Sequence, residues 1–458
     1  MKNEEFVNSY KDIPDANSSS IKMVEANIPI DIYEGIYTLR NENVEYKFIG
    51  NIVFEWTPNM GTYFYGNPIS PDSGIYAFVN EGTYSIIVDE VEFGQGFVVN
   101  TSIGIQGKHF IKGVISKSAI LGDKSIPVEK IKFSVPNFAE LHGTSIKKGT
   151  EEGGVHFSRG RLTLEDELYT ITIDKCIDYK ERKNSLNEKG GYIVLYNGEL
   201  VRKKGAIAYE ESKDIFHCLN TFLTFLNGRK TSTLFLQGIC EDEEIWTDYS
   251  CYTVDSWKSV HTWIQRLSID GINDLWNNFR KIWNKSDNQS FLAYLIHWYV
   301  QSNGNIQFSE GSIILAQTAL ELVYNWWIVE NKKMILGKDS ENINASNKIR
   351  LLISQLSISS KVPKAFKKLE EFVKMTDRVN DAPEAIVYVR NAIVHSQEEK
   401  RKKLSAIHYM AIYEALQVFI WYIELSLLCI LEYKGKYSNR CSESRIQSYT
   451  EVLVPWEK

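Results

Sequence analysis

The first half of the chain alternates short runs of β-branched and aromatic residues with clusters of Gly, Asn, Asp and Pro. Such runs, bounded by turn-forming residues, predict β-strands joined by turns. The expected strands lie at 28–37, 44–56, 84–91, 110–115, 131–135, 162–173 and 191–195. Two polar stretches, 151–154 and 181–190, predict exposed loops, and a seam within this region is expected near 145–155.

The pattern changes to helical spacing after residue 210. Apolar residues recur every three or four positions over 212–225, which predicts an amphipathic helix, and Asn227-Gly228 is typical of a helix end. A strand pair (231–238 and 244–252) and a helix (272–283) follow. Further helices are expected at 288–302, 309–332, 344–358, 363–376, 382–396 and 402–433, before an extended tail. The patterns therefore predict an α+β multidomain protein, with a β-rich region at 1–285 and an all-α bundle at 286–458.

Composition indicates a soluble globular protein, because 43% of the 458 residues are hydrophobic and 24% are charged. The formal net charge of −6 disfavours a protein that coats polyanions in general. The six cysteines include no C-x-x-C pair, and the polar N-terminus has no apolar core of a signal peptide. We therefore expect a cytoplasmic protein without a zinc site or other cofactor.

The most apolar stretch, residues 416–431, is interrupted by Glu424 and is short for a bilayer span. A buried core helix or a subunit-contact helix is the better interpretation, and no membrane partner is expected.

The most informative motif is Arg390-Asn391-Ala392-Ile393-Val394-His395, within the helix expected at 382–396. Asp381 and Glu384 form a capping-box pattern at the start of that helix. Helical spacing places Ile386, Val389 and Ile393 on a core-facing stripe, and it places Asn391 and His395 together on the opposite face near Tyr388.

Arg390 does not share the face of His395. Five positions separate the two residues, which is about 140° around an ideal helix. Either the helix is distorted near the motif, or two copies of the bundle combine their residues in one site. A two-fold dimer brings the same patch of both subunits together, so we expect the site to lie at a dimer cleft.

These residue types suit RNA cleavage without a metal ion. RNA supplies the 2′-hydroxyl as nucleophile, a histidine can take and return the proton, and an arginine can stabilise the phosphate charge. Asn391 can donate to the same phosphate or orient His395. The products would carry a 2′,3′-cyclic phosphate and a 5′-hydroxyl. The competing interpretation is that His395 is an ordinary surface or capping histidine.

Other residues could assist such a site. Glu321, in an apolar helix, could orient His395 or Arg390, although a surface role is also open. The run Lys400, Arg401, Lys402 and Lys403 directly follows the motif and could contact RNA. Between residues 361 and 403, 11 Lys and Arg stand against 7 Asp and Glu, so this segment is locally basic. Arg401 and His408 form a similar spacing without asparagine, and we interpret them as exposed residues.

The R-N-x-x-x-H motif, late in an all-α C-terminal region, resembles the HEPN superfamily of ribonucleases. The resemblance implies a helical bundle of about 170 residues that dimerises and builds a metal-independent site, with Arg390, Asn391 and His395 matching the motif. The wider layout resembles the Apea-like branch of antiphage defence proteins. The supporting patches are Phe48-Ile49-Gly50 through Trp56-Thr57-Pro58, residues 223–229, and Val454-Pro455-Trp456.

This resemblance implies an antiphage, abortive-infection type endoribonuclease, whose β-rich region senses a phage-derived trigger or restrains the nuclease. The main alternative is a non-catalytic HEPN module that dimerises or binds a ligand, joined to a β-rich recognition domain. A third interpretation is a carbohydrate- or peptide-binding β-module with a helical dimerisation tail.

Overall fold

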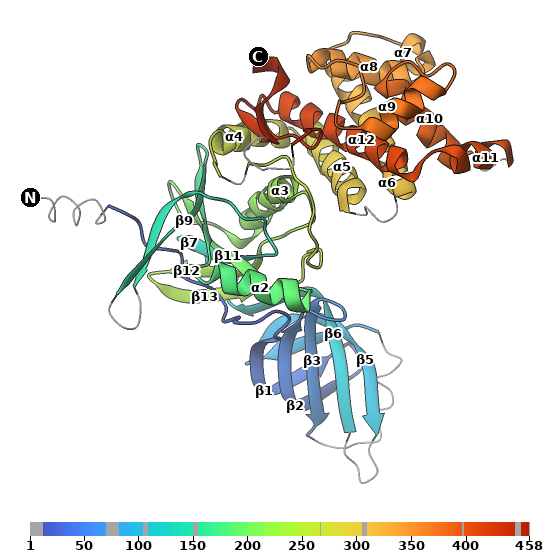
Figure 1. Ribbon diagram of the computed structural model, residues 1–458. Coiled ribbons are helices and arrows are strands. Elements are labelled where there is room, and N and C mark those ends of the chain that lie inside the picture. The colour runs from blue at the N-terminus through green and yellow to red at the C-terminus, as the bar shows by residue number, and fades with distance from the viewer. Residues whose placement is uncertain are drawn as a thin grey trace, which may run out of the picture. The chain divides into compact units, whose positions relative to one another are not determined.

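The chain divides into two compact units, formed by residues 1–217 with 231–258 and by residues 218–230 with 259–458. The computed structural model describes residues 12–69, 82–103, 109–149, 154–265, 267–304, 309–395, 398–444 and 450–457. The prediction of an α+β protein with a β-rich N-terminal region followed by a helical region is confirmed (Figure 1).

The first unit is built on a 13-stranded antiparallel sheet in the described residues. Its strands are β1 (Ile30–Arg40), β2 (Glu45–Glu55), β3 (Gly61–Pro68), β4 (Tyr84–Val88), β5 (Val91–Ile103), β6 (His109–Gly122), β7 (Lys130–Pro136), β8 (Thr144–Gly149), β9 (Val155–Glu165), β10 (Tyr169–Lys175), β11 (Val194–Arg202), β12 (Leu234–Cys240) and β13 (Glu243–Asp248). Strands β3, β5 and β8 were not expected from the sequence. The glycines within β3 and β5 interrupt the alternation of apolar and polar residues, and β8 is short and polar.

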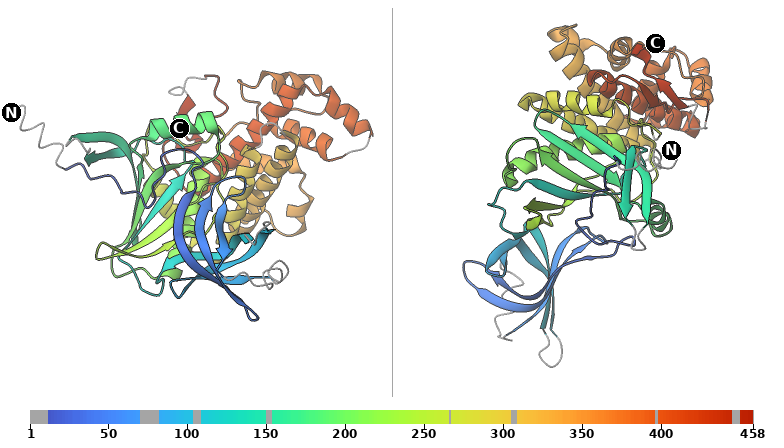
Figure 2. Two further views of the ribbon diagram at one scale, coloured as in Figure 1. Left: turned by 90° about the horizontal axis from the view of Figure 1, so that it is seen from below. Right: turned by 90° about the vertical axis from the view of Figure 1, so that its left-hand side faces the viewer.

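Strands β1 to β6 close into a barrel, because β3 pairs with β6 as well as with β2. Both figures show these strands, in blue to cyan, curving toward one another (Figures 1 and 2). The interior is filled by aromatic and aliphatic side chains, among them Tyr37, Phe48 and Phe64. A Cβ at Gly113 would lie only 1.9 Å from Cζ of Phe64, so glycine is required where that ring packs across β6.

The expectation of an exposed loop at 181–190 is wrong, because α2 (Tyr179–Lys189) occupies this stretch. Only Tyr179 and Leu186 of this helix are buried, so its apolar spacing is too sparse to be recognised. An ion pair of Arg182 with Asp178 (2.8 Å) supports the helix, which ends at Gly190, where φ is positive. The other expected loop, 151–154, lies outside the described residues except for Gly154.

The second unit is helical. Its elements include the end of α3 (Tyr209–Asn227), α4 (Ile272–Trp283), α5 (Ser286–Gly304), α6 (Ser309–Val323), the π-helix η3 (Tyr324–Asn331), α7 (Lys338–Asn342), α8 (Ala345–Gln355), α9 (Lys367–Met375), α10 (Ala382–Val394), α11 (Glu398–Ala406), α12 (Tyr409–Ile430), strands β14 (Lys436–Ser438) and β15 (Glu451–Leu453), and the short η4 (Pro455–Glu457). Helix α4 belongs to this unit because Trp276 and Phe279 pack edge-on against Phe222, at 5.2 and 5.3 Å between ring centroids. The sequence pattern placed the start of the helical unit at residue 286, and in the structure this unit begins earlier in the chain.

Helix α12 is the core of this unit, and it packs against α5, α6, α8, α9 and α10. The helix expected at 402–433 is in fact two helices. The break lies at His408, which is the N-cap of α12 and accepts a hydrogen bond from the amide of Met410 at 3.1 Å.

Two helical stretches, Glu310–Asn331 and Tyr409–Ile430, are long and apolar enough to cross a membrane by length and composition alone. The most apolar part of the second is 89% buried within the protein. This burial supports the interpretation of α12 as a core helix.

Candidate functional site at the end of helix α10

The start of α10 is fixed by a network of side chains. Asp381 is the N-cap and accepts a hydrogen bond from the amide of Glu384 at 3.0 Å, which confirms the predicted cap. Glu384 in turn accepts from the amide of Asn380 at 2.8 Å. Arg350, from α8, donates to Asp381 at 2.8 and 2.9 Å and pairs with Glu384 at 2.7 Å. The hydrogen bond from Arg350 holds the pKa of the Glu384 carboxyl below its usual value. This network anchors the helix that carries the motif.

Replacement of Asp381 by alanine should lower the free energy of unfolding by about 2 kcal/mol, because the helix loses its cap and Arg350 loses a carboxylate partner. Urea unfolding followed by tryptophan fluorescence measures the change. The matched control is Asp377→Ala, at an exposed position in the preceding loop, which should change stability by no more than about 0.5 kcal/mol. Equal effects of the two substitutions would contradict the role given to Asp381.

The buried face of α10 differs slightly from the expected stripe. Ile386 and Val389 are buried as predicted, whereas Ile393 is only half-buried. Ala392 is buried as well. Arg390 and Asn391 are half-buried, and His395 is exposed.

The three residues of the motif lie at the C-terminal end of α10. Arg390 Nη1 donates a hydrogen bond to Oδ1 of its neighbour Asn391 at 3.0 Å. The Nε atom of Arg390 is buried, with no hydrogen-bond partner among the described residues. His395 is the C-cap, where the backbone turns to an extended conformation, and its amide still donates to the carbonyl oxygen of Asn391 at 3.2 Å. The helix therefore ends at Val394, two residues earlier than expected, and is assigned as α-helix throughout 382–394.

The basic residues after the motif lie on α11. Lys402 is exposed and forms an ion pair with Glu398 at 2.8 Å, and Lys403 is half-buried. The backbone at Lys400 and Arg401 belongs to the same helix, but their side chains lie outside the described residues. The structure thus places a helix with a lysine at its surface directly after the motif.

The two supporting candidates have other partners. Glu321 forms an ion pair with Lys348 at 3.0 Å, and Tyr388 packs edge-on against Phe372 of α9 at 5.5 Å between ring centroids. The ion pair of Glu321 fits the surface role that was left open for it. Across the described ranges, no three His, Cys, Asp or Glu side chains gather as metal ligands would.

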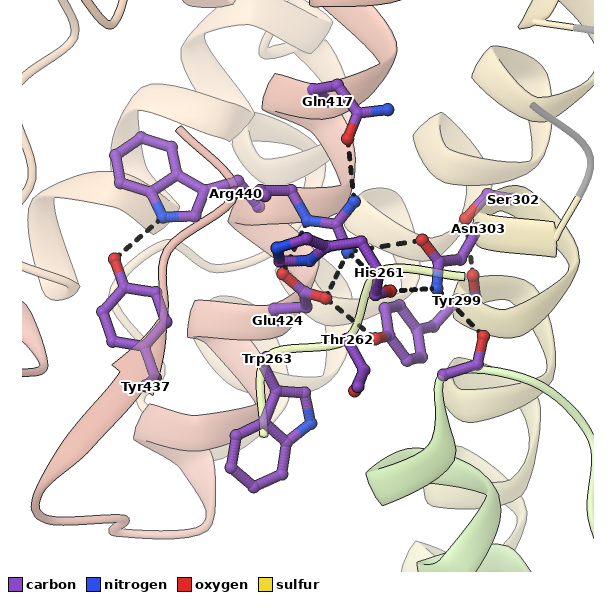
Figure 3. A network of polar contacts seen from close by, with 12 residues as sticks. His261, Thr262, Trp263, Tyr299, Ser302, Asn303, Gln417, Glu424, Tyr437 and Arg440 are labelled. Atoms are coloured by element: carbon purple, nitrogen blue, oxygen red, sulfur yellow. Dashed lines mark hydrogen bonds and ion pairs between the residues drawn. The ribbon is translucent and has the colours of Figure 1, made fainter. Parts of the chain in front are cut away.

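The helical unit also contains a buried polar network that the sequence patterns did not predict. The side chains of Arg440 and Glu424 are 2% and 0% exposed, and they form two hydrogen bonds of 2.8 and 2.5 Å. Tyr299 donates to the same carboxylate at 2.8 Å, and Arg440 also donates to Gln417 at 2.9 Å (Figure 3). The signal in the sequence was the charge of Glu424 within an apolar helix, since a buried charge requires a partner. The partner is distant in sequence, so no spacing rule could identify Arg440.

Comparison with known proteins gives matches along most of the chain. Residues 123–260 match the model of the YopA central domain, and residues 285–452 match that of the YopA C-terminal domain. The SPbeta prophage-derived uncharacterized protein YopA of Bacillus subtilis (strain 168) is 27% identical over 454 residues, which cover 96% of this chain and 98% of the relative. No solved structure matches the chain. Neither family description mentions a HEPN domain, so the HEPN resemblance stays a prediction. In both its sheet-rich and its helical parts, the chain is therefore similar to YopA proteins.

Proposed function

We propose that the chain is a metal-independent endoribonuclease whose reaction is carried by Arg390, Asn391 and His395. The observation that supports this most is the arrangement at the end of α10. Asn391 is hydrogen-bonded to Arg390, and His395 stands exposed at the C-cap, bound through its amide to Asn391. An arginine, an amide and an imidazole at one helix end offer a phosphate donor and a proton acceptor to a strand of RNA.

In the proposed reaction His395 takes the proton of the ribose 2′-hydroxyl. The 2′-oxygen then forms a bond to phosphorus while the bond from phosphorus to the 5′-oxygen breaks. The leaving 5′-oxygen receives a proton from His395, which the 2′-hydroxyl has protonated, so the products are a 2′,3′-cyclic phosphate and a 5′-hydroxyl. Arg390 stabilises the negative charge that builds on the phosphate oxygens. Lys402 and Lys403, with Lys400 and Arg401, would attract the RNA backbone.

The geometry of α10 favours a site shared by two copies of the chain. Because α10 keeps its regular course through Val394, Arg390 and His395 diverge on one copy as ideal helical geometry requires. A two-fold dimer through the helical unit could bring Arg390 of one copy near His395 of the other. Val394, next to His395, is 41% exposed, and this apolar surface would be covered in such a dimer.

One observation favours the non-catalytic alternative. Arg390 already donates to Asn391, and Lys402 already pairs with Glu398. Two of the cationic groups proposed to contact RNA therefore have partners within the chain. His395 argues against this alternative, because a helical module that only dimerises or binds a partner would have no need of an exposed histidine there.

The proposed setting is host defence against phage, with the β-rich region as sensor or restraint. Its support is the resemblance to Apea-like proteins and the similarity to a relative whose name places it in a prophage. A sensor is expected on physical grounds, because an unrestrained ribonuclease would degrade the RNA of its own cell.

The nature of the products tests the chemistry. Purified protein incubated with RNA in EDTA, with extract from phage-infected cells as a source of the trigger, should leave 2′,3′-cyclic phosphate ends. The same oligonucleotide with a 2′-deoxyribose at the cleaved position should stay intact, because it lacks the nucleophile. RNA that stays whole under these conditions, or cleavage at the deoxy position, would contradict the proposed mechanism.

A further inference from the structure

The helical unit contains a cavity of about 770 Å³ that lies apart from the motif in sequence. Its walls come from the first half of α12, the segment that leads into α9, residues 261–264 and the C-terminal segment after β14. This volume falls within the range of small-molecule sites, which is roughly 300–1,000 Å³.

Two buried polar side chains of α12 line the cavity. Glu414 and Gln417 are 8% and 7% exposed, and they lie three residues apart, on one face of the helix. Gln417 Oε1 accepts the hydrogen bond from Arg440, which leaves its Nε2 amide as a donor without an acceptor among the described residues. Glu414 accepts from the amide of Leu369 at 2.6 Å, and a carboxyl can accept a further hydrogen bond. The cavity therefore offers a fixed donor beside an acceptor.

Two lysines line the cavity where the chain enters α9. Lys364 and Lys367 are exposed, and neither forms an ion pair with any described residue. The amides at the start of α9 face the carboxylate of Glu414, so the ammonium groups are the anion-binding groups at this end. Glu443, from the C-terminal segment, also lines the cavity and adds a second carboxylate. An anion would therefore favour the lysines, and a hydrogen-bond donor would favour the carboxylates.

Apolar side chains complete the walls. Phe366, Met410 and Tyr413 also line the cavity. Polar and charged side chains make up most of the lining, and these apolar side chains give the ligand a surface to pack against.

We propose that this cavity binds a small phosphomonoester metabolite, with its phosphate at Lys364 and Lys367 and its other polar groups hydrogen-bonded to Glu414 and Gln417. Besides its phosphate, the ligand must carry both a hydrogen-bond donor, for the carboxylate, and an acceptor, for the Gln417 amide. A sugar hydroxyl and an adenine edge both meet this requirement. The proposal does not rest on ribonuclease activity, because it involves neither Arg390 nor His395.

Isothermal titration calorimetry on the full chain tests the proposal with AMP, glucose 6-phosphate, adenosine and inorganic phosphate as probes. AMP or glucose 6-phosphate should bind once per chain. Adenosine and inorganic phosphate should each bind at least about tenfold more weakly, because each lacks one half of the recognised groups. Comparison of the affinities for AMP and glucose 6-phosphate also shows whether the cavity prefers a nucleotide or a sugar phosphate.

The decisive variant is the double substitution Lys364→Ala/Lys367→Ala, which should weaken binding of the phosphomonoester at least about tenfold. The matched control is Lys361→Ala/Lys338→Ala, which removes two exposed lysines of the same unit that do not line the cavity. All four positions are exposed, so both proteins should fold, and equal melting temperatures verify this. Absence of binding by both phosphomonoesters at about 10 mM, or equal binding by the decisive variant and the wild type, would overturn the proposal. Phosphate binding as tight as that of the phosphomonoesters would overturn it too.

Discussion

Replacement of His395 by alanine should lower the rate of RNA cleavage by about 10²–10⁴-fold, because the reaction loses its general acid and base. The side chain is exposed at the C-cap of α10, and the cap itself is made by the backbone amide, so the variant should keep the stability of the wild type. Cleavage of a fluorescent RNA oligonucleotide in EDTA, at equal protein concentrations, gives the two rates.

Arg390→Ala should cause a loss of similar size, and a mixture of the two variants tests whether the site is shared. If each site takes Arg390 from one copy and His395 from the other, a mixed dimer keeps one intact site of two. Random exchange makes half of the dimers mixed, so the mixture should recover about a quarter of the wild-type rate. A mixture as inactive as the separate variants would contradict a site assembled in this way.

His408→Asn is the matched control for His395→Ala. His408 is also exposed, and together with Arg401 it forms the other Arg-and-His pair of similar spacing, but it caps α12. Asparagine keeps a hydrogen-bond acceptor at the N-cap, so stability and cleavage should both be retained. Loss of cleavage in this variant equal to that of His395→Ala would mean that the assay reports folding of the bundle rather than catalysis.

Local patterns were sufficient where local interactions determine the structure. The capping box at Asp381 and Glu384 was predicted from four residues, and the start of α10 lies where the pattern placed it. The same reasoning failed at α2, where two buried side chains in eleven residues gave no helical period. It also joined α11 and α12, because a histidine is an uncommon N-cap and His408 gives no strong stop signal.

Long-range partners were out of reach of the sequence patterns. The sequence showed that the charge of Glu424 interrupts an apolar helix, but it could not show that Arg440 lies against it. The same limit applies to the motif, since helical spacing predicted that Arg390 and His395 diverge but could not identify what stands opposite each of them. The closing of the barrel by β3 and β6 is a third case, because the two strands are far apart along the chain.

The largest effect on stability is expected from Arg440→Met, which should lower the free energy of unfolding of the helical unit by about 3–5 kcal/mol. The substitution leaves the carboxylate of Glu424 fully buried, with the hydroxyl of Tyr299 as its remaining hydrogen-bond donor in the described part of the chain (Figure 3). For a unit of this size the melting temperature should fall by roughly 2–4 °C for each kcal/mol. Thermal unfolding followed by circular dichroism at 222 nm, roughly the helix minimum, measures the change.

The double variant Arg440→Met/Glu424→Gln separates the cost of an unpaired buried charge from the loss of packing. Glutamine keeps an acceptor for Tyr299 without the charge, so the double variant should be more stable than Arg440→Met alone by about 2 kcal/mol or more. Lys374→Met, which breaks the exposed pair with Glu370, should cost no more than about 1 kcal/mol. If Arg440→Met and the double variant unfold together, the destabilisation comes from lost packing and hydrogen bonds of the arginine, and the charge of Glu424 is not what requires Arg440.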